Sequence, residues 1–198
     1  MPKHFSQITT DHNGEMIFFS SQDSIIEFLG GPQIESYEGV CLALVMMWLA
    51  QDTSKTSPLA GIRNKTRACN LQSEMESDWR GFETVAAKGQ EVIAKNFWWK
   101  SDQKENIMGD TPSKYLLNDP LNSRDGLHIL VLYQEEGSGH AIGVWRFPSG
   151  AIAIYDPNQG ACVQRGENLE AFLQDFIGQV YPEMTSFAVC SWYSEPND

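Results

Sequence analysis

Apolar residues along the chain form two patterns, one typical of helices and the other of strands. Almost every residue from 40 to 50 is apolar. A helix that is apolar all round is buried on all sides, so we expect this segment to be the central helix of the core. Residues 169–180 have apolar positions that recur on one helical face, and this pattern predicts an amphipathic helix.

Two further segments are predicted as helices. Residues 79–99 carry apolar side chains at roughly helical spacing and form the longest helical candidate, in which Gly89 is a potential break or kink. Residues 24–29 predict a short helix that Gly30-Gly31-Pro32 stops. Residues 101–124 are polar and contain two prolines, so we expect a long loop there with at most one short helix.

Strand-like runs dominate the second half of the chain, over residues 127–134, 140–147, 151–156 and 186–193. Short connections rich in Gly, Ser, Glu or Pro separate the first three runs and are typical of hairpins. Helices followed by antiparallel strands predict an α+β domain. The only comparably apolar surface available to the helix over residues 40–50 is that sheet, so we expect the two to pack together.

The length of the chain indicates how many domains it forms, and its charge indicates which classes of partner it can bind. A chain of 198 residues fits one domain with a substantial core. The first 20 residues are polar apart from one short apolar patch, and we expect them to form a loosely held arm before a single domain over residues 21–198. The formal net charge of −12 argues against a nucleic-acid partner bound through a basic surface.

Several expected absences narrow the class of protein. No apolar run approaches the roughly 18 to 20 residues that span a bilayer, and no apolar signal-peptide core is visible near residue 1. The four cysteines are scattered, without the close pairs of a zinc site or the density of a disulfide framework. We therefore expect no membrane span, metal or cofactor. The protein is expected in the cytoplasm, or secreted without a cleaved signal.

A Cys, a His and an Asp each stand in a local sequence that suits catalysis. Cys41 follows a turn and begins the apolar helix, where free N–H groups favour a thiolate. His140 opens a strand, and Asp156 ends the next strand 16 residues later, so the hairpin should bring the carboxylate beside the imidazole. His128 also begins a strand but lacks such a carboxylate. Nucleophile, base and orienting carboxylate are the parts of a thiol acyl-transfer site.

Such a site also needs hydrogen-bond donors for an oxyanion. The N–H of Cys41 is one candidate, and a side-chain donor should come from the segment just before the nucleophile. Gln33 is the best chemical candidate there, and Ser36 is the second. The ordinary structural roles stay open beside these assignments, because a free Cys often packs as a small apolar residue and Asp-Pro-Asn forms turns in many proteins.

Three short blocks of sequence resemble the YopT-type cysteine proteases of bacterial pathogens and plant symbionts, a family of the papain-like superfamily. The blocks are Gly39-Val40-Cys41-Leu42-Ala43-Leu44 with Trp48-Leu49, then Gly139-His140-Ala141-Ile142-Gly143, and then Tyr155-Asp156-Pro157-Asn158-Gln159-Gly160. The resemblance implies a papain-like α+β catalytic domain over residues 21–198. It also implies a triad of Cys41, His140 and Asp156, and delivery into a target cell as an effector.

The leading hypothesis is a cysteine protease that hydrolyses a peptide bond in a protein of a target cell, as a bacterial effector or toxin. Two alternatives remain open. The same triad could catalyse glutamine deamidation, acyl transfer or hydrolysis of a peptidoglycan amide, or the scaffold could be a binding module without catalysis. Acidic residues near the expected site would favour a basic substrate segment, namely Glu35, Glu38, Glu135 and Glu136. The oligomeric state is not predicted.

Overall fold

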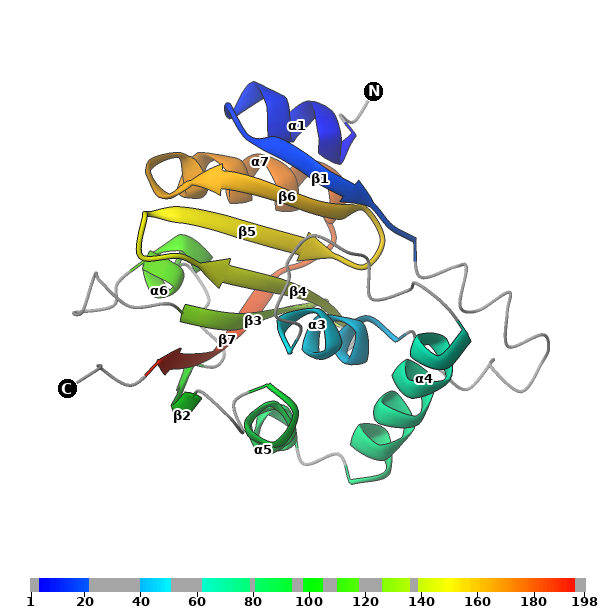
Figure 1. The fold of residues 1–198 in the computed structure, drawn as a ribbon. Helices are drawn as coiled ribbons and strands as arrows, with labels where there is room; N and C mark the ends of the chain where they lie inside the picture. Colours follow the sequence, from blue (N-terminus) through cyan, green and yellow to red (C-terminus); the bar gives the residue numbers. More distant parts are fainter. Residues whose placement is uncertain are drawn as a thin grey trace.

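The computed structural model describes residues 4–21, 40–50, 62–78, 81–93, 98–104, 110–117, 126–135 and 139–194. Within these ranges, seven strands form one antiparallel sheet in the order β1-β6-β5-β4-β3-β7-β2 (Figure 1). The strands are β1 Glu15–Phe19, β2 Trp98–Lys104, β3 Gly126–Tyr133, β4 Gly139–Arg146, β5 Ala151–Asp156, β6 Gly160–Arg165 and β7 Ser186–Ser194.

The described helices cover both faces of the sheet. They are α1 Phe5–Asp11, α3 Cys41–Leu49, α4 Ile62–Ser77, α5 Phe82–Val92, α6 Pro112–Leu117 and α7 Leu169–Val180, with a short 3₁₀ turn at Gly166–Asn168. One core lies between the sheet and α3, α4 and α5, and a second lies between the sheet and α1, α6 and α7 (Figure 1). Along β3, Ile129 and Val131 enter the first core while Leu130 and Leu132 enter the second, as the alternation of strand side chains requires.

Helix α3 is the central buried helix that the sequence predicts. Every residue from Leu42 to Leu49 is buried. The helix lies close to the sheet because β4 carries Gly143 beneath it, where an added Cβ would stand 2.9 Å from the ring of Trp48. The α+β class and the packing of this helix on an antiparallel sheet are therefore confirmed. The amphipathic helix over residues 169–180 is confirmed as α7.

Two predictions in the middle of the chain are wrong in part. The single helix expected over residues 79–99 ends at Val92, and Trp98 begins strand β2. Strand β2 pairs with β7 at the edge of the sheet and extends to Lys104, into a segment that was expected to be a loop. Local spacing could not reveal this pairing, because its partner lies about 90 residues further along the chain. The one short helix allowed in that loop is α6.

The prediction of a loosely held arm over residues 1–20 is wrong for residues 5–19. Phe5 and Ile8 of α1 are buried, and the Phe5 ring packs against Phe176 of α7 at a centroid distance of 4.8 Å. Strand β1 then pairs with β6 and completes the sheet at its other edge. Helix α4 and strand β6 were not anticipated either. The helix expected over residues 24–29 lies outside the described residues, and no described helix is long and apolar enough to cross a membrane.

The close approach of α3 to β4 gives a prediction about stability. Gly143→Ala should lower the free energy of unfolding by roughly 1–3 kcal/mol, because the added methyl group meets the Trp48 ring in a filled core. Gly178→Ala is the matched control, since it adds the same group to α7 where nothing lies within 4 Å. The control should raise stability by about 0.5–1 kcal/mol. Denaturant unfolding of both variants checks this, and equal effects would contradict it.

Candidate active site

Cys41 is the first residue of α3 and sits at the end of the helix where backbone N–H groups lack helical partners. The Ala43 N–H donates to Oε1 of Gln72 in α4 at 3.2 Å. The N–H groups of Leu42 and Ala141 donate to the Cys41 sulfur. Ala141 lies near the start of β4, the central strand, so the start of the helix and the start of this strand meet at the sulfur. Cys41 itself remains partly exposed.

His140 is buried at the start of β4 and forms hydrogen bonds on two sides. Its Nε2 lies 3.1 Å from Oδ2 of Asp156, and the ring also makes a hydrogen bond with Cys41. The hairpin of β4 and β5, with Gly143 opposite Tyr155, brings the imidazole and the carboxylate together. The structure thus places Cys41, His140 and Asp156 in one hydrogen-bonded series.

The carboxylate of Asp156 is fully buried and accepts several hydrogen bonds. Oδ1 accepts the N–H of Asn158 at 2.7 Å, and Oδ2 accepts the hydroxyl of Tyr181 at 2.8 Å in addition to the His140 contact. A buried carboxylate requires such donors, because without them it would be protonated or would destabilise the fold. The Asp-Pro-Asn turn is therefore both a tight connection between β5 and β6 and the element that fixes this carboxylate.

The electrostatics of the site favour a thiolate beside an imidazolium. Burial alone raises the pKa of Cys41, but the hydrogen bond and charge of His140 and the two backbone N–H groups outweigh burial and lower it from 9.0. Burial likewise lowers the pKa of His140, but the charge of Asp156 and the hydrogen bonds from Asp156 and Cys41 outweigh it and raise the value to about 10. Both shifts stabilise the charged pair over the neutral one.

His128 shows what the same side chain does without a carboxylate. It is fully buried on β3, and its Nδ1 lies 2.7 Å from Oγ of Ser191. Burial and the nearby charge of Arg146 lower its pKa to about 3, so it stays neutral. His140 differs because it faces Asp156 and Cys41, whose charges and hydrogen bonds raise its pKa. As expected from the sequence, only one of the two strand-opening histidines faces an acid.

Tyr181 belongs to the same cluster and was not found by sequence analysis. Its hydroxyl lies 3.0 Å from Nε2 of His140, and its ring is stacked on the imidazole with a centroid distance of 4.7 Å and an interplanar angle of 28°. It follows α7 and is 25 residues from Asp156. No spacing rule links a residue after a helix to a preceding hairpin, so the sequence carries no signal for it.

The expected oxyanion donors Gln33 and Ser36 lie outside the described residues. So do three of the acidic residues expected near the site, and the fourth, Glu135, is exposed. Among the described residues, no group of three or more His, Cys, Asp or Glu side chains is placed to hold a metal ion. The roles of Gln33 and Ser36 as oxyanion donors, and of the acidic residues near the site, therefore stay predictions.

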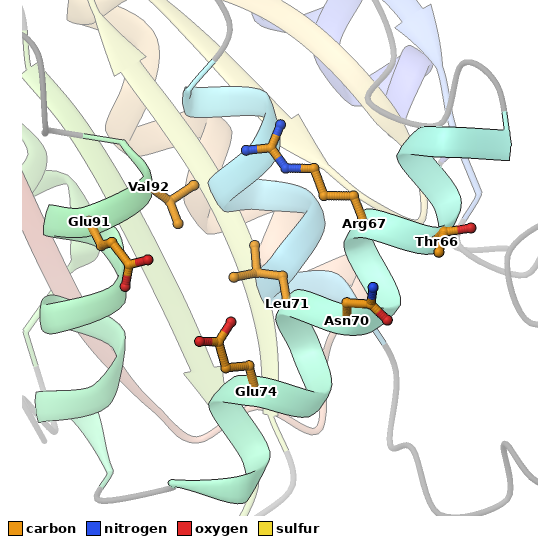
Figure 2. Close-up of a pocket in the computed structure, with 7 residues that line it drawn as sticks. All are labelled: Thr66, Arg67, Asn70, Leu71, Glu74, Glu91 and Val92. Carbon is orange, nitrogen blue, oxygen red and sulfur yellow. The ribbon is translucent and has the colours of Figure 1, made fainter.

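A pocket of about 540 Å³ lies between α4 and α5 (Figure 2). Its lining residues are Thr66, Arg67, Asn70, Leu71, Glu74, Glu91 and Val92. At its edge, Lys88 forms ion pairs with Glu74 and Glu91 at 2.7 and 2.9 Å. None of Cys41, His140 and Asp156 lines this pocket, so it is distinct from the hydrogen-bonded cluster.

Comparisons with known proteins show a likeness in fold. The structure is similar to the crystal structure of the Pseudomonas avirulence protein AvrPphB, with a TM-score of 0.58 and 15% identity over 80% of this chain and 93% of AvrPphB. AvrPphB is a YopT-type cysteine protease effector, and the likeness of this chain to it is one of fold. The resemblance seen in the sequence is thus confirmed at the level of fold.

The structure was also matched to that of PatoxP, a cysteine protease-like domain of the Photorhabdus asymbiotica toxin PaTox. This match has a TM-score of 0.44 and 12% identity, and it covers 93% of this chain and 56% of PatoxP. No family model matches the sequence, and no curated protein matches it.

The chemical contrast among the cysteines gives a prediction about reactivity. Iodoacetamide at neutral pH should modify Cys41 at least about tenfold faster than the other cysteines, since each unit of pKa changes the thiolate fraction about tenfold. Burial raises the pKa of Cys69, and it raises that of Cys162 to about 12, while Cys190 is inaccessible. Peptide mapping by mass spectrometry measures each site. Fastest modification at Cys69 would contradict the prediction, and Cys41→Ser should remove the fast phase.

Proposed function

We propose that this protein is a cysteine-type hydrolase that cleaves a peptide bond in a protein of a target cell. The observation that supports this most is the hydrogen-bonded series of Cys41, His140 and Asp156, with the sulfur at the start of a helix. In this proposal Cys41 is the nucleophile, His140 is the acid and base, and Asp156 orients the imidazole and stabilises its charge.

The proposed reaction has two steps. The Cys41 thiolate attacks the carbonyl carbon, and the oxygen takes the negative charge near the N–H of Cys41 at the start of α3. The imidazolium of His140 protonates the leaving amine as the carbon–nitrogen bond breaks, which leaves an acyl group on sulfur. His140 then removes a proton from water, the hydroxide attacks the thioester, and the acid and the free thiol are released. Gln33, or in second place Ser36, is the proposed side-chain donor to the oxyanion.

The fold and the charge support a proposal about the cellular role. Likeness in fold to an avirulence protein supports an effector or toxin that acts in another cell. A net charge of −12 supports a substrate with a basic segment, because opposite charges speed and strengthen encounter.

Comparison of target-cell lysates treated with wild type and with Cys41→Ala tests the reaction. We expect new protein N-termini only with wild type, because the variant lacks the nucleophile and should lose at least about 10³-fold in rate. Mass spectrometry of the same samples reports glutamine converted to glutamate, which would assign the triad to deamidation instead. Cleavage that persists with Cys41→Ala would overturn the proposal, and Cys69→Ala is the control that should keep full activity.

The pKa shifts give the expected pH dependence. Activity should rise at a pH below 9.0 as Cys41 loses its proton, because its pKa is lowered, and it should fall near pH 10 as His140 loses its proton. Asp156→Asn removes the charge that raises the pKa of His140, so the alkaline limb should move to lower pH and kcat should fall more than KM rises. A pH profile of kcat/KM measures both limbs. An unchanged alkaline limb in this variant would contradict the assignment.

A further inference from the structure

Tyr181 contacts both members of the acid–base pair. Its hydroxyl lies 2.8 Å from Oδ2 of Asp156 and 3.0 Å from Nε2 of His140. A phenol has one proton to donate, and the carboxylate is the acceptor that cannot donate in return. Burial and the charge of Asp156 raise the pKa of Tyr181, so the phenol keeps this proton throughout the working range of the site. The hydroxyl therefore donates to Asp156.

This bond limits the motion of the carboxylate. The Asn158 N–H holds Oδ1 at 2.7 Å, and the Tyr181 hydroxyl holds Oδ2 at 2.8 Å. With both oxygens fixed, the remaining acceptor direction of Oδ2 faces Nε2 of His140 at 3.1 Å. Removing the hydroxyl would leave one oxygen fixed and allow the carboxylate to turn away from the imidazole.

The ring of Tyr181 also covers the imidazole. It is stacked on His140, and Tyr181 is itself 7% exposed. Three contacts hold Tyr181 in this place. Its backbone N–H donates to the carbonyl of Ile177 at the end of α7, and its ring makes an edge contact with the ring of Phe176. Its hydroxyl accepts a hydrogen bond from the Asn158 side chain at 3.4 Å. Water is thus kept from the bond between His140 and Asp156, and in a water-poor site that bond is stronger.

We propose that Tyr181 is a positioning residue that fixes the Asp156 carboxylate through its hydroxyl, shields the His140–Asp156 bond through its ring, and thereby maintains the reactive state of Cys41. The effect of Tyr181 on hydrolysis rests on the proposed function. Its effect on the reactivity of the Cys41 sulfur does not depend on any substrate.

The titratable groups around the imidazole come from three elements: Cys41 from α3, Asp156 from β5 and Tyr181 after α7. Tyr155 on β5 and Cys162 on β6 also lie near the Asp156 charge, and burial raises the pKa of both and keeps them protonated. The charges that the test follows in this cluster are therefore those of Cys41, whose pKa is lowered from 9.0, and of His140, whose pKa is raised to about 10.

The test measures the rate at which iodoacetamide alkylates Cys41 as a function of pH in wild type, Tyr181→Phe and Tyr181→Ala. Tyr181→Phe keeps the stacked ring and removes the hydroxyl, so we expect the rate at neutral pH to fall about tenfold, the effect of one hydrogen bond to a charged group. The acid limb should move to higher pH, because a less favourable imidazolium raises the pKa of Cys41 toward 9.0. Tyr181→Ala should show a larger shift in the same direction.

Tyr115→Phe is the matched control. Tyr115 also donates its hydroxyl to a carboxylate, that of Asp110, but it lies on α6 at the other end of the sheet from the turn after Asp156 (Figure 1). This variant should lose a comparable bond and leave the alkylation profile of Cys41 unchanged. Circular dichroism melting of all variants reports their folding, and Tyr181→Phe carries the test should Tyr181→Ala fail to fold.

Two results would overturn the inference. One is an alkylation profile for folded Tyr181→Phe that matches wild type. The other is an equal shift in Tyr115→Phe, which would reduce the effect to general stability. Lack of hydrolysis by wild type would count against the proposed function, and the alkylation profiles would still decide the role of Tyr181.

Discussion

The structure depends on the close packing of α3 against β4. A glycine at position 143 lets α3 lie close to the sheet, with the ring of Trp48 packed over the glycine. Because the helix begins beside the start of β4, the Ala141 N–H of this strand reaches the Cys41 sulfur, and the neighbouring His140 ring reaches it as well. Buried apolar packing therefore brings the Cys41 sulfur to His140, a juxtaposition that the local sequence around Cys41 does not determine. The start of α3 is further held from behind by Gln72 of α4.

A second constraint is the cost of burying charge. His140 and Asp156 are both almost fully buried, where a single unpaired charge would be costly. Each is tolerated because the other neutralises it and because Asn158 and Tyr181 supply the remaining donors. The contrast with His128, which burial keeps neutral, shows that the surroundings and not the residue type decide the charge.

The parts of the site that the sequence could predict are those governed by short-range geometry. A two-strand hairpin brings His140 beside Asp156 with few alternatives, and an all-apolar segment must be a buried helix. The parts that sequence reasoning missed depend on distant partners. Strand β2 forms because β7 is available to pair with it. Helix α4 is polar overall and buries only a narrow stripe that includes Ala68, Leu71 and Met75. Tyr181 reaches the cluster only once α7 has docked on the sheet.

The proposed activation of the Cys41 thiol does not specify which amide is attacked. The hydrogen bonds of the cluster concern the sulfur, the imidazole and the carboxylate, and they would serve a peptide bond, a glutamine side chain or a peptidoglycan amide equally well. Discrimination must then come from surfaces that hold the substrate on either side of the sulfur. The pocket between α4 and α5 is lined by both signs of charge and by none of the three residues of the cluster. In the proposed function, reactivity and selectivity therefore have separate origins: reactivity comes from the packing of α3 on the sheet, and selectivity comes from the surfaces on either side of the sulfur.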